Sequence, residues 1–209
     1  AHAVLPETLG AAGAHGPEMG AHPDGTPWFR VGDYRLDGVR YAGSPFMDVD
    51  VRLQRMDEAG IDFQVLSPNP LTFLHFIEAD QARAFCRTHN DALAALVARH
   101  PDRLAGMAAL PAQDPDAAAE ELDRAVGELG LLCGYIGTDM PHPLDDARMD
   151  RLYEACVRRD VPLFLHPSPA GIDGPPGDPN LRRYDLDVVV GFAAQETIAV
   201  ATLIYGGVL

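Results

Sequence analysis

The sequence predicts an α/β fold made of repeated strand–helix–strand units. Short apolar runs alternate with helical patterns at intervals of roughly thirty to forty residues, which is typical of parallel strands joined by helices. One run, residues 161–166 (VPLFLH), carries no charged residue before its terminal histidine. Such a run is typical of a central strand buried on both faces of a helix-covered parallel sheet. The open doubly wound sheet and the (β/α)8 TIM barrel both satisfy this pattern.

The phosphate-binding motifs of the doubly wound folds are missing. No GxGxxG follows a predicted strand, and no GxxxxGK[ST] occurs, so the dinucleotide-binding and P-loop interpretations lose their main support. The barrel is therefore favoured. A complete barrel takes about 250 residues, whereas this chain has 209. We expect one domain over residues 1–209, an incomplete barrel running from the end of strand 1 through the helix after strand 5 and truncated at both ends.

Local signals place the elements along the chain. Asp48 is suited to cap a helix that ends at Gly60, and Asp114 followed by Pro115 marks the start of another. The predicted helices cover residues 48–60, 79–100, 114–130, a stretch from Asp145 or Asp146 through Cys156, and 187–205, and the predicted strands cover 61–67, 104–110, 131–137 and 161–166. Residues 10–45 are rich in glycine and predict a long loop or small insertion, with a short hairpin near Trp28. A second loop is predicted at 167–184.

Charge and cysteine content restrict the function. The net charge of −15, from 31 acidic and 16 basic residues, argues against nucleic acid as a partner. Three well-separated cysteines form no CxxC pair and indicate neither a disulfide framework nor a cysteine zinc cluster. We find no apolar run of about 18 residues and no signal-peptide pattern. These observations predict a cytoplasmic protein whose partner is a small molecule or another protein.

His166 is the first candidate functional residue. It ends an apolar strand, at the edge of a parallel sheet where ligands bind, so its imidazole could bind a metal or transfer protons. A histidine in that place can equally be a packed or capped side chain. His75 follows the second strand and could line the same pocket, whereas His89, His100 and His142 lack ligand spacing and are expected to be structural or solvated.

Several segments together resemble one enzyme family. They are residues 47–67 (MDVDVRLQRMDEAGIDFQVLS), 103–114 (RLAGMAALPAQD), 135–138 (YIGT), 163–167 (LFLHP) and 196–208 (ETIAVATLIYGGV). In order and spacing they resemble the amidohydrolase-related proteins of the aminocarboxymuconate-semialdehyde decarboxylase type. The resemblance implies a (β/α)8 barrel of the metal-dependent hydrolase type that holds one divalent metal, most often zinc, and forms a homodimer.

The resemblance also implies the site residues. His2 matches the second histidine of the family's HxH pair after the first strand, and His166 matches the histidine that ends the fifth, so both are expected to bind the metal. The family's acid/base histidine and its late aspartate would lie beyond Leu209 in this numbering. Arg40 falls where relatives place an arginine that grips a substrate carboxylate, although it could also be a solvated side chain. Ser168 stands where related decarboxylases tend to have tryptophan, which leaves the substrate open.

The implied activity is non-oxidative decarboxylation of a small unsaturated or aromatic carboxylic acid without a redox cofactor. A metal-activated water could also hydrolyse a lactone, an amide or a carbon–carbon bond. A third possibility is a catalytically incompetent fragment that acts as an interaction protein, because an open parallel sheet leaves an apolar edge uncovered.

Overall fold

The parallel strands follow one another in sequence order. The computed structural model describes residues 1–138, 140–168, 183–184 and 186–209, so most of the predicted loop at 167–184 lies outside the described residues. Two three-stranded parallel sheets have the orders β1-β5-β6 and β7-β8-β9. Their strands are β1 (His2–Ala3), β5 (Gln64–Pro68), β6 (Leu104–Gly106), β7 (Ala108–Ala109), β8 (Gly134–Gly137) and β9 (Leu163–His166).

Backbone hydrogen bonds join these two sheets at one break. The predicted strand at 104–110 is interrupted at Met107, whose N–H donates to the carbonyl of Leu66 at 2.8 Å, and Leu132 N–H donates to Gly106 at 2.9 Å. Strands β6 and β7 are therefore two parts of one interrupted strand, of which β6 pairs with β5 and β7 pairs with β8. The predicted α/β class with parallel sheets is confirmed, whereas closure into a barrel is not seen among the described strands.

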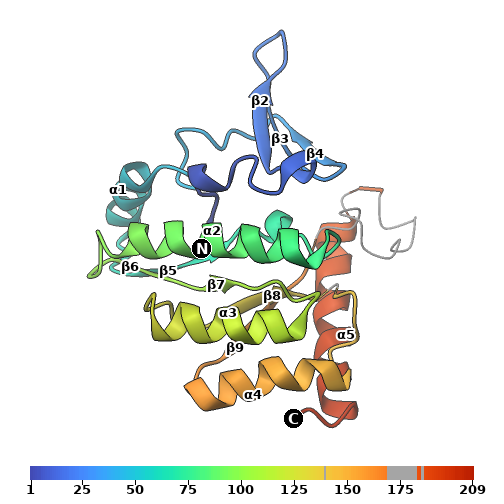
Figure 1. Ribbon diagram of the computed structural model, residues 1–209. Helices are drawn as coiled ribbons and strands as arrows, with labels where there is room; N and C mark the ends of the chain where they lie inside the picture. Colours follow the sequence, from blue (N-terminus) through green and yellow to red (C-terminus); the bar gives the residue numbers. More distant parts are fainter. Residues whose placement is uncertain (139, 169–182, 185) are drawn as a thin grey trace.

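Four helices follow the parallel strands in alternation. They are α1 (Val49–Ala59), α2 (Ala79–Val97), α3 (Pro115–Gly127) and α4 (Asp150–Arg159). The predicted caps are observed: Asp48 accepts hydrogen bonds at the start of α1, Gly60 ends it with a φ of 67°, and Asp114 caps α3. Helices α2, α3 and α4 lie one below the other along the strands (Figure 1). Their buried faces and the strands form the main apolar core.

A small antiparallel sheet occupies part of the segment predicted as a long loop. Its strands are β2 (Glu18–Ala21), β3 (Pro27–Val31) and β4 (Tyr34–Asp37), in the order β2-β3-β4. The hairpin expected near Trp28 is present, and β2 was not predicted. The sheet stands above α2 in Figure 1. Phe29 and Val31 are buried in a second core with residues that follow β5, including Leu71 and Leu74, so the sheet packs onto the strand ends.

The prediction that residues 161–166 form a central strand buried on both faces is wrong. Strand β9 stands last in its sheet order, and Phe164 is 46% exposed. Side chains two apart in a strand share a face, so Phe164 and His166 lie on the same side of the sheet. No described strand pairs with the outer edge of β9.

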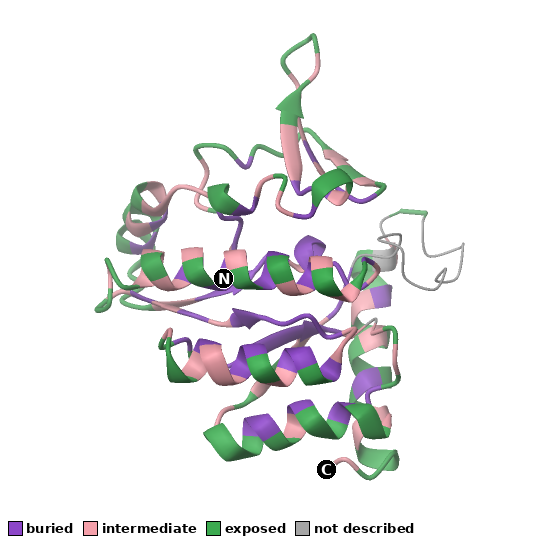
Figure 2. Ribbon diagram, in the orientation of Figure 1, coloured by how far each residue is buried: buried purple, intermediate pink, exposed green. Residues whose placement is uncertain are grey.

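The last helical segment is also largely exposed. It consists of a π-helical turn, η6 (Asp187–Gly191), followed by α5 (Phe192–Tyr205). The stretch Val188–Tyr205 has a mean hydropathy of 1.6 and is long and apolar enough to cross a membrane, with 11% of it buried. The sequence shows no uninterrupted apolar run of this length because Gln195 and Glu196 lie within the stretch, which is apolar only on average. A single such helix is weak evidence for a membrane span, and Figure 2 shows that α5 is mostly exposed or intermediate.

Short helical turns complete the chain. They are η1 (Pro6–Thr8), η2 (Gly13–His15), η3 (Pro70–Thr72) and η4 (Ala147–Met149). Asn69 accepts a hydrogen bond from Leu71 N–H at the start of η3, and Asp146 accepts one from Arg148 N–H at the start of η4. The pair Asp145 and Asp146, which resembles paired catalytic carboxylates in the sequence, therefore includes a helix cap.

Candidate metal centre

Two histidines predicted to share a site lie side by side. His2 in β1 and His166 at the end of β9 have ring centroids 4.9 Å apart, with their planes at 85°. They lie in the first and the last of the described parallel strands, 164 positions apart in the sequence. The fold therefore brings together the two residues for which the sequence predicts metal binding.

The hydrogen bonds of both rings leave one nitrogen of each for a ligand. His166 Nδ1 lies 2.7 Å from the carbonyl oxygen of Pro167. A carbonyl oxygen only accepts, so Nδ1 carries the proton and Nε2 has the free lone pair. His2 Nδ1 lies 3.0 Å from Ser67 Oγ, a bond that leaves Nε2, and the backbone carbonyl of Pro68 also lies near this ring. Metal-binding histidines are commonly oriented through their other ring nitrogen in this way.

The electrostatic environment keeps His2 neutral. Burial of the ring, followed by the nearby His166 and the amino terminus, lowers the pKa of His2 from 6.5 to about 4. A neutral imidazole is the form that binds a metal ion. The neutral form of His2, together with the orientation and separation of the two rings, thus suits a shared divalent ion.

The described residues supply only part of a complete coordination shell. They contain no group of three or more histidine, cysteine, aspartate or glutamate side chains placed to hold a metal. Structural and catalytic zinc sites use three or four protein ligands. His2 and His166 therefore fit two ligand positions, and any further ligand lies outside the described residues.

Aromatic rings line the sheet next to the two histidines. Tyr135 in β8 lies 5.8 Å from His166 between ring centroids, and Phe73 lies 5.3 Å from Tyr135. His75 stacks on Phe73 at 5.2 Å and is 7% exposed. This agrees with the prediction that His75 is close to the strand ends. The wall would suit the face of a flat, unsaturated ligand.

Arg52 positions the strand that carries His2, and the sequence analysis missed it. Its guanidinium is 7% exposed and donates to the His2 carbonyl at 2.6 Å and to Gln64 Oε1 at 3.0 Å. The sequence signal that could have identified Arg52 is its place next to Leu53, one of the apolar residues of α1 that pack on the core. Arginines in amphipathic helices are usually solvated, so the pattern alone favours the wrong interpretation.

Arg40 is exposed, whereas its neighbour Tyr41 is buried. Tyr41 Oη accepts a hydrogen bond from Asn69 Nδ2 at 3.3 Å, and Asn69 directly follows β5. Arg40 therefore emerges from the chain near the strand ends that bear the histidines. Its predicted role in gripping a carboxylate stays a prediction.

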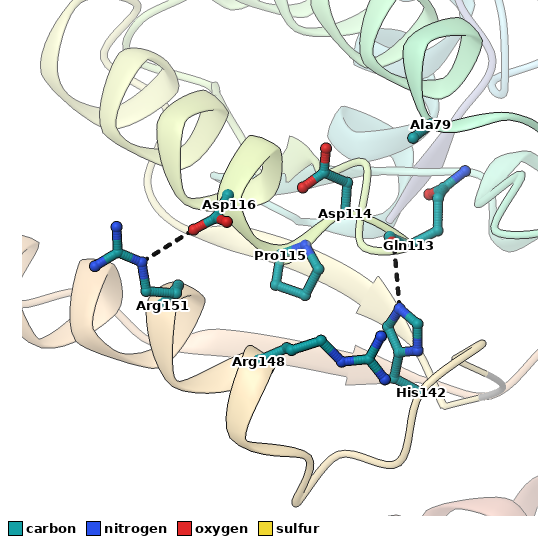
Figure 3. Close-up of a pocket in the computed structure, with 8 residues that line it drawn as sticks. All are labelled: Ala79, Gln113, Asp114, Pro115, Asp116, His142, Arg148 and Arg151. Carbon is teal, nitrogen blue, oxygen red and sulfur yellow. Dashed lines mark hydrogen bonds and ion pairs between the residues drawn. The ribbon is translucent and has the colours of Figure 1, made fainter.

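A separate polar hollow of about 530 Å³ opens between the starts of α2, α3 and α4 (Figure 3). Its charged groups are paired: Arg151 Nε lies 3.0 Å from Asp116, whereas Arg148 and Asp114 pair with Asp146 and Arg83, which do not line the hollow. His142 Nε2 lies 3.2 Å from the carbonyl of Gln113. With these charges already paired, the hollow lacks the unbalanced charge of an ion-binding site.

Comparison with known proteins establishes the family. The amidohydrolase family matches residues 19–209. The chain belongs to this family. It is 32% identical over 176 residues to a 2-amino-3-carboxymuconate-6-semialdehyde decarboxylase of Dictyostelium discoideum, covering 83% of this chain and 48% of the relative. It is 36% identical over 176 residues to a gamma-resorcylate decarboxylase of Rhodococcus jostii, covering 79% and 48%. The resemblance predicted from the sequence is confirmed.

Solved structures agree with this amidohydrolase assignment. A 5-carboxyvanillate decarboxylase from Sphingomonas paucimobilis matches with a TM-score of 0.70 and 26% identity, over 77% of this chain and 48% of that one. A dihydroxybenzoic acid decarboxylase from Polaromonas, with bound manganese and the inhibitor 2-nitroresorcinol, matches with a TM-score of 0.64 and 31% identity, over 76% and 50%. The amidohydrolase chain described here spans about half the length of these relatives.

Proposed function

We propose that this chain contributes the metal-binding half of a non-oxidative decarboxylase that acts on a small aromatic or unsaturated carboxylic acid. The observation that carries the proposal is the pairing of His2 and His166, with Nε2 of each ring left for a ligand. Relatives with between 31% and 36% identity are named as decarboxylases of such acids, which supports the same substrate class here.

His2 and His166 would hold one divalent ion, for which zinc is our proposal and manganese the alternative found with a relative. When bound, the ion supplies a Lewis acid and a water of lowered pKa. Ser67 and the Pro167 carbonyl keep the two rings oriented, and the aromatic wall of Phe73 and Tyr135 excludes water from one side of the ligand.

The reaction needs no electron acceptor. The bond between the ring carbon and the carboxylate breaks, CO2 leaves, and the ring carbon takes up a proton. Arg40 would orient the carboxylate before the bond breaks, because a guanidinium offers two parallel hydrogen bonds to it. Its exposed position next to Tyr41 leaves it free to turn toward a bound acid. We also propose that the protein is cytoplasmic and forms a homodimer. Sedimentation of the purified protein would test the dimer.

The test is whether candidate acids are converted to their decarboxylated phenols. The purified chain, loaded with Zn²⁺ or Mn²⁺, is incubated with 2,6-dihydroxybenzoate and with 5-carboxyvanillate, and the decarboxylated phenols are measured by chromatography. We expect product with at least one acid, lost in His166→Ala and retained in the control His100→Gln. Metal-loaded protein that forms no product from any such acid, while it hydrolyses a lactone or amide, would refute decarboxylation in favour of hydrolysis.

A second candidate is supported by the exposed apolar surface of α5. Ile198, Val200 and Ile204 are 66%, 51% and 53% exposed, and Tyr205 is 90% exposed. Apolar area of this kind favours association with another protein. An interaction protein without activity would bind no metal, so the metal content of the chain separates the two candidates.

A further inference from the structure

Tyr135 is a buried tyrosine in contact with the candidate metal centre. Its side chain projects from β8, whose residue Gly137 pairs with His166 in β9. The side chain is 3% exposed, and its ring lies 5.8 Å from the ring of His166. Tyr135 and Gly137 are two positions apart, so Tyr135 lies on the sheet face that carries His166. Its phenol is thus held beside the metal-binding ring.

The hydroxyl of Tyr135 lacks a partner of good geometry. It is buried and has no hydrogen-bond partner among the described residues. Burial raises the pKa of this phenol, and the nearby Ser67 hydroxyl opposes the rise. Buried tyrosine hydroxyls usually find a partner. A hydroxyl kept in this position points to a ligand.

The tautomers of the site determine what this hydroxyl can do. If Nε2 of His2 binds the metal, Nδ1 carries the proton and donates to Ser67 Oγ, 3.0 Å away. The Tyr135 hydroxyl has no hydrogen-bond partner among the described residues, so its proton can be donated to an acceptor atom of a ligand.

We propose that Tyr135 donates a hydrogen bond to an oxygen of the aromatic carboxylic acid that binds beside His2 and His166. The inference rests on the proposed function and adds to it a binding residue that neither the resemblance nor the strand pattern marks. The best acceptor that such an acid offers is its carboxylate, because a hydrogen bond to a charged oxygen is about twice as strong as a neutral one. Tyr135 would therefore favour acids over the phenols left after CO2 is lost.

Calorimetric titration of the full chain tests this role. The protein is loaded with Mn²⁺ and titrated with 2,6-dihydroxybenzoate, in wild type, Tyr135→Phe and the control Tyr153→Phe. The Tyr153 hydroxyl donates to the carbonyl of Leu144 at 2.6 Å, away from the histidines, so the control removes a phenol hydroxyl without touching the site. Affinity for Mn²⁺ is measured separately for each protein, as is the melting temperature of the metal-free chain.

We expect Tyr135→Phe to weaken binding of the acid by about tenfold, with unchanged Mn²⁺ affinity and an unchanged melting temperature. Tyr153→Phe should bind the acid as wild type does. Equal acid affinity in Tyr135→Phe and wild type would refute the role of Tyr135 while leaving the proposed function intact. A lowered melting temperature with unchanged acid affinity would identify a structural hydroxyl. Mn²⁺-loaded wild type that binds no acid would refute the proposed function, and this role with it.

Discussion

Asn90 ties helix α2 to strand β7, and its removal gives the largest stability effect that we predict outside the site. It lies in α2, is fully buried, and both accepts from the N–H of Ala109 at 2.8 Å and donates to the carbonyl of Ala109 at 2.9 Å. The same amide donates to Glu121 Oε1 at 2.8 Å. Glu121 is 2% exposed and also bonds Arg124.

The magnitude follows from the groups that the substitution leaves without partners. Asn90→Ala removes the partners of two buried backbone groups of Ala109, each worth about 1–3 kcal/mol when left unsatisfied. Glu121 loses one bond but keeps the contact of 2.6 Å between its Oε1 and Arg124, so its charge stays paired. We therefore expect a fall in the free energy of unfolding of about 3–5 kcal/mol, a large part of the total for a domain.

Urea unfolding followed by circular dichroism measures this change. The matched control is Thr88→Ala in the same helix, because the Thr88 hydroxyl is exposed and bonds only its own helix, at the carbonyl of Ala84. The control should change the free energy of unfolding by less than about 0.5 kcal/mol. A loss below about 1 kcal/mol for Asn90→Ala would refute the reasoning, because the two Ala109 groups would then have found other partners.

Three further predictions concern buried groups away from the metal centre. Burial lowers the pKa of His89 to about 4, so the unfolded chain binds a proton below pH 6.5 that the folded chain excludes. Stability is complete above pH 6.5, and His89 should cost about 2 kcal/mol between pH 7 and pH 5 in urea unfolding. Burial raises the pKa of the Cys133 thiol to about 11, so a disulfide reagent at pH 8 should modify it only after unfolding. In Gly134→Val the new Cβ would lie 2.7 Å from Leu110 and 2.9 Å from Leu163, so calorimetry should show a lower melting temperature, equivalent to about 1–3 kcal/mol.

Each of these has a contradicting result. His89→Gln should lose part of the pH dependence, whereas the control His100→Gln should keep it, and identical profiles for the two variants would refute the assignment. Rapid modification of native Cys133 would contradict its burial. An unchanged melting temperature in Gly134→Val would mean that the packed side chains move apart at little cost.

The elements that the sequence predicts well are those with local signals. Asp48, Gly60 and Asp114 mark helix ends through their own hydrogen bonds or backbone angles, so the helices α1 and α3 are found close to their predicted bounds. The break at Met107 and the bridging role of Asn90 depend on partners far along the chain. Neither leaves a periodic pattern, because a buried asparagine in a helix looks like a solvated one.

The site was predicted only in part for a similar reason. The strand pattern identified His166 as a candidate, and the family resemblance added His2 and Arg40. Ser67 and Tyr135 sit in apolar strands where nothing in the sequence separates a polar group that faces a ligand from one that packs. The edge position of β9 could not be predicted either, because an uncharged sequence does not indicate whether its strand pairs with one neighbouring strand or with two.

Metal content tests the central claim most directly. The purified chain, dialysed against Zn²⁺ or Mn²⁺ and then against metal-free buffer, is measured by elemental analysis alongside His2→Ala, His166→Ala and His100→Gln. We predict about one divalent ion per chain in wild type and in His100→Gln, and loss of that ion in both site variants. Metal-free wild type, or an ion retained in both site variants, would contradict a metal centre at His2 and His166.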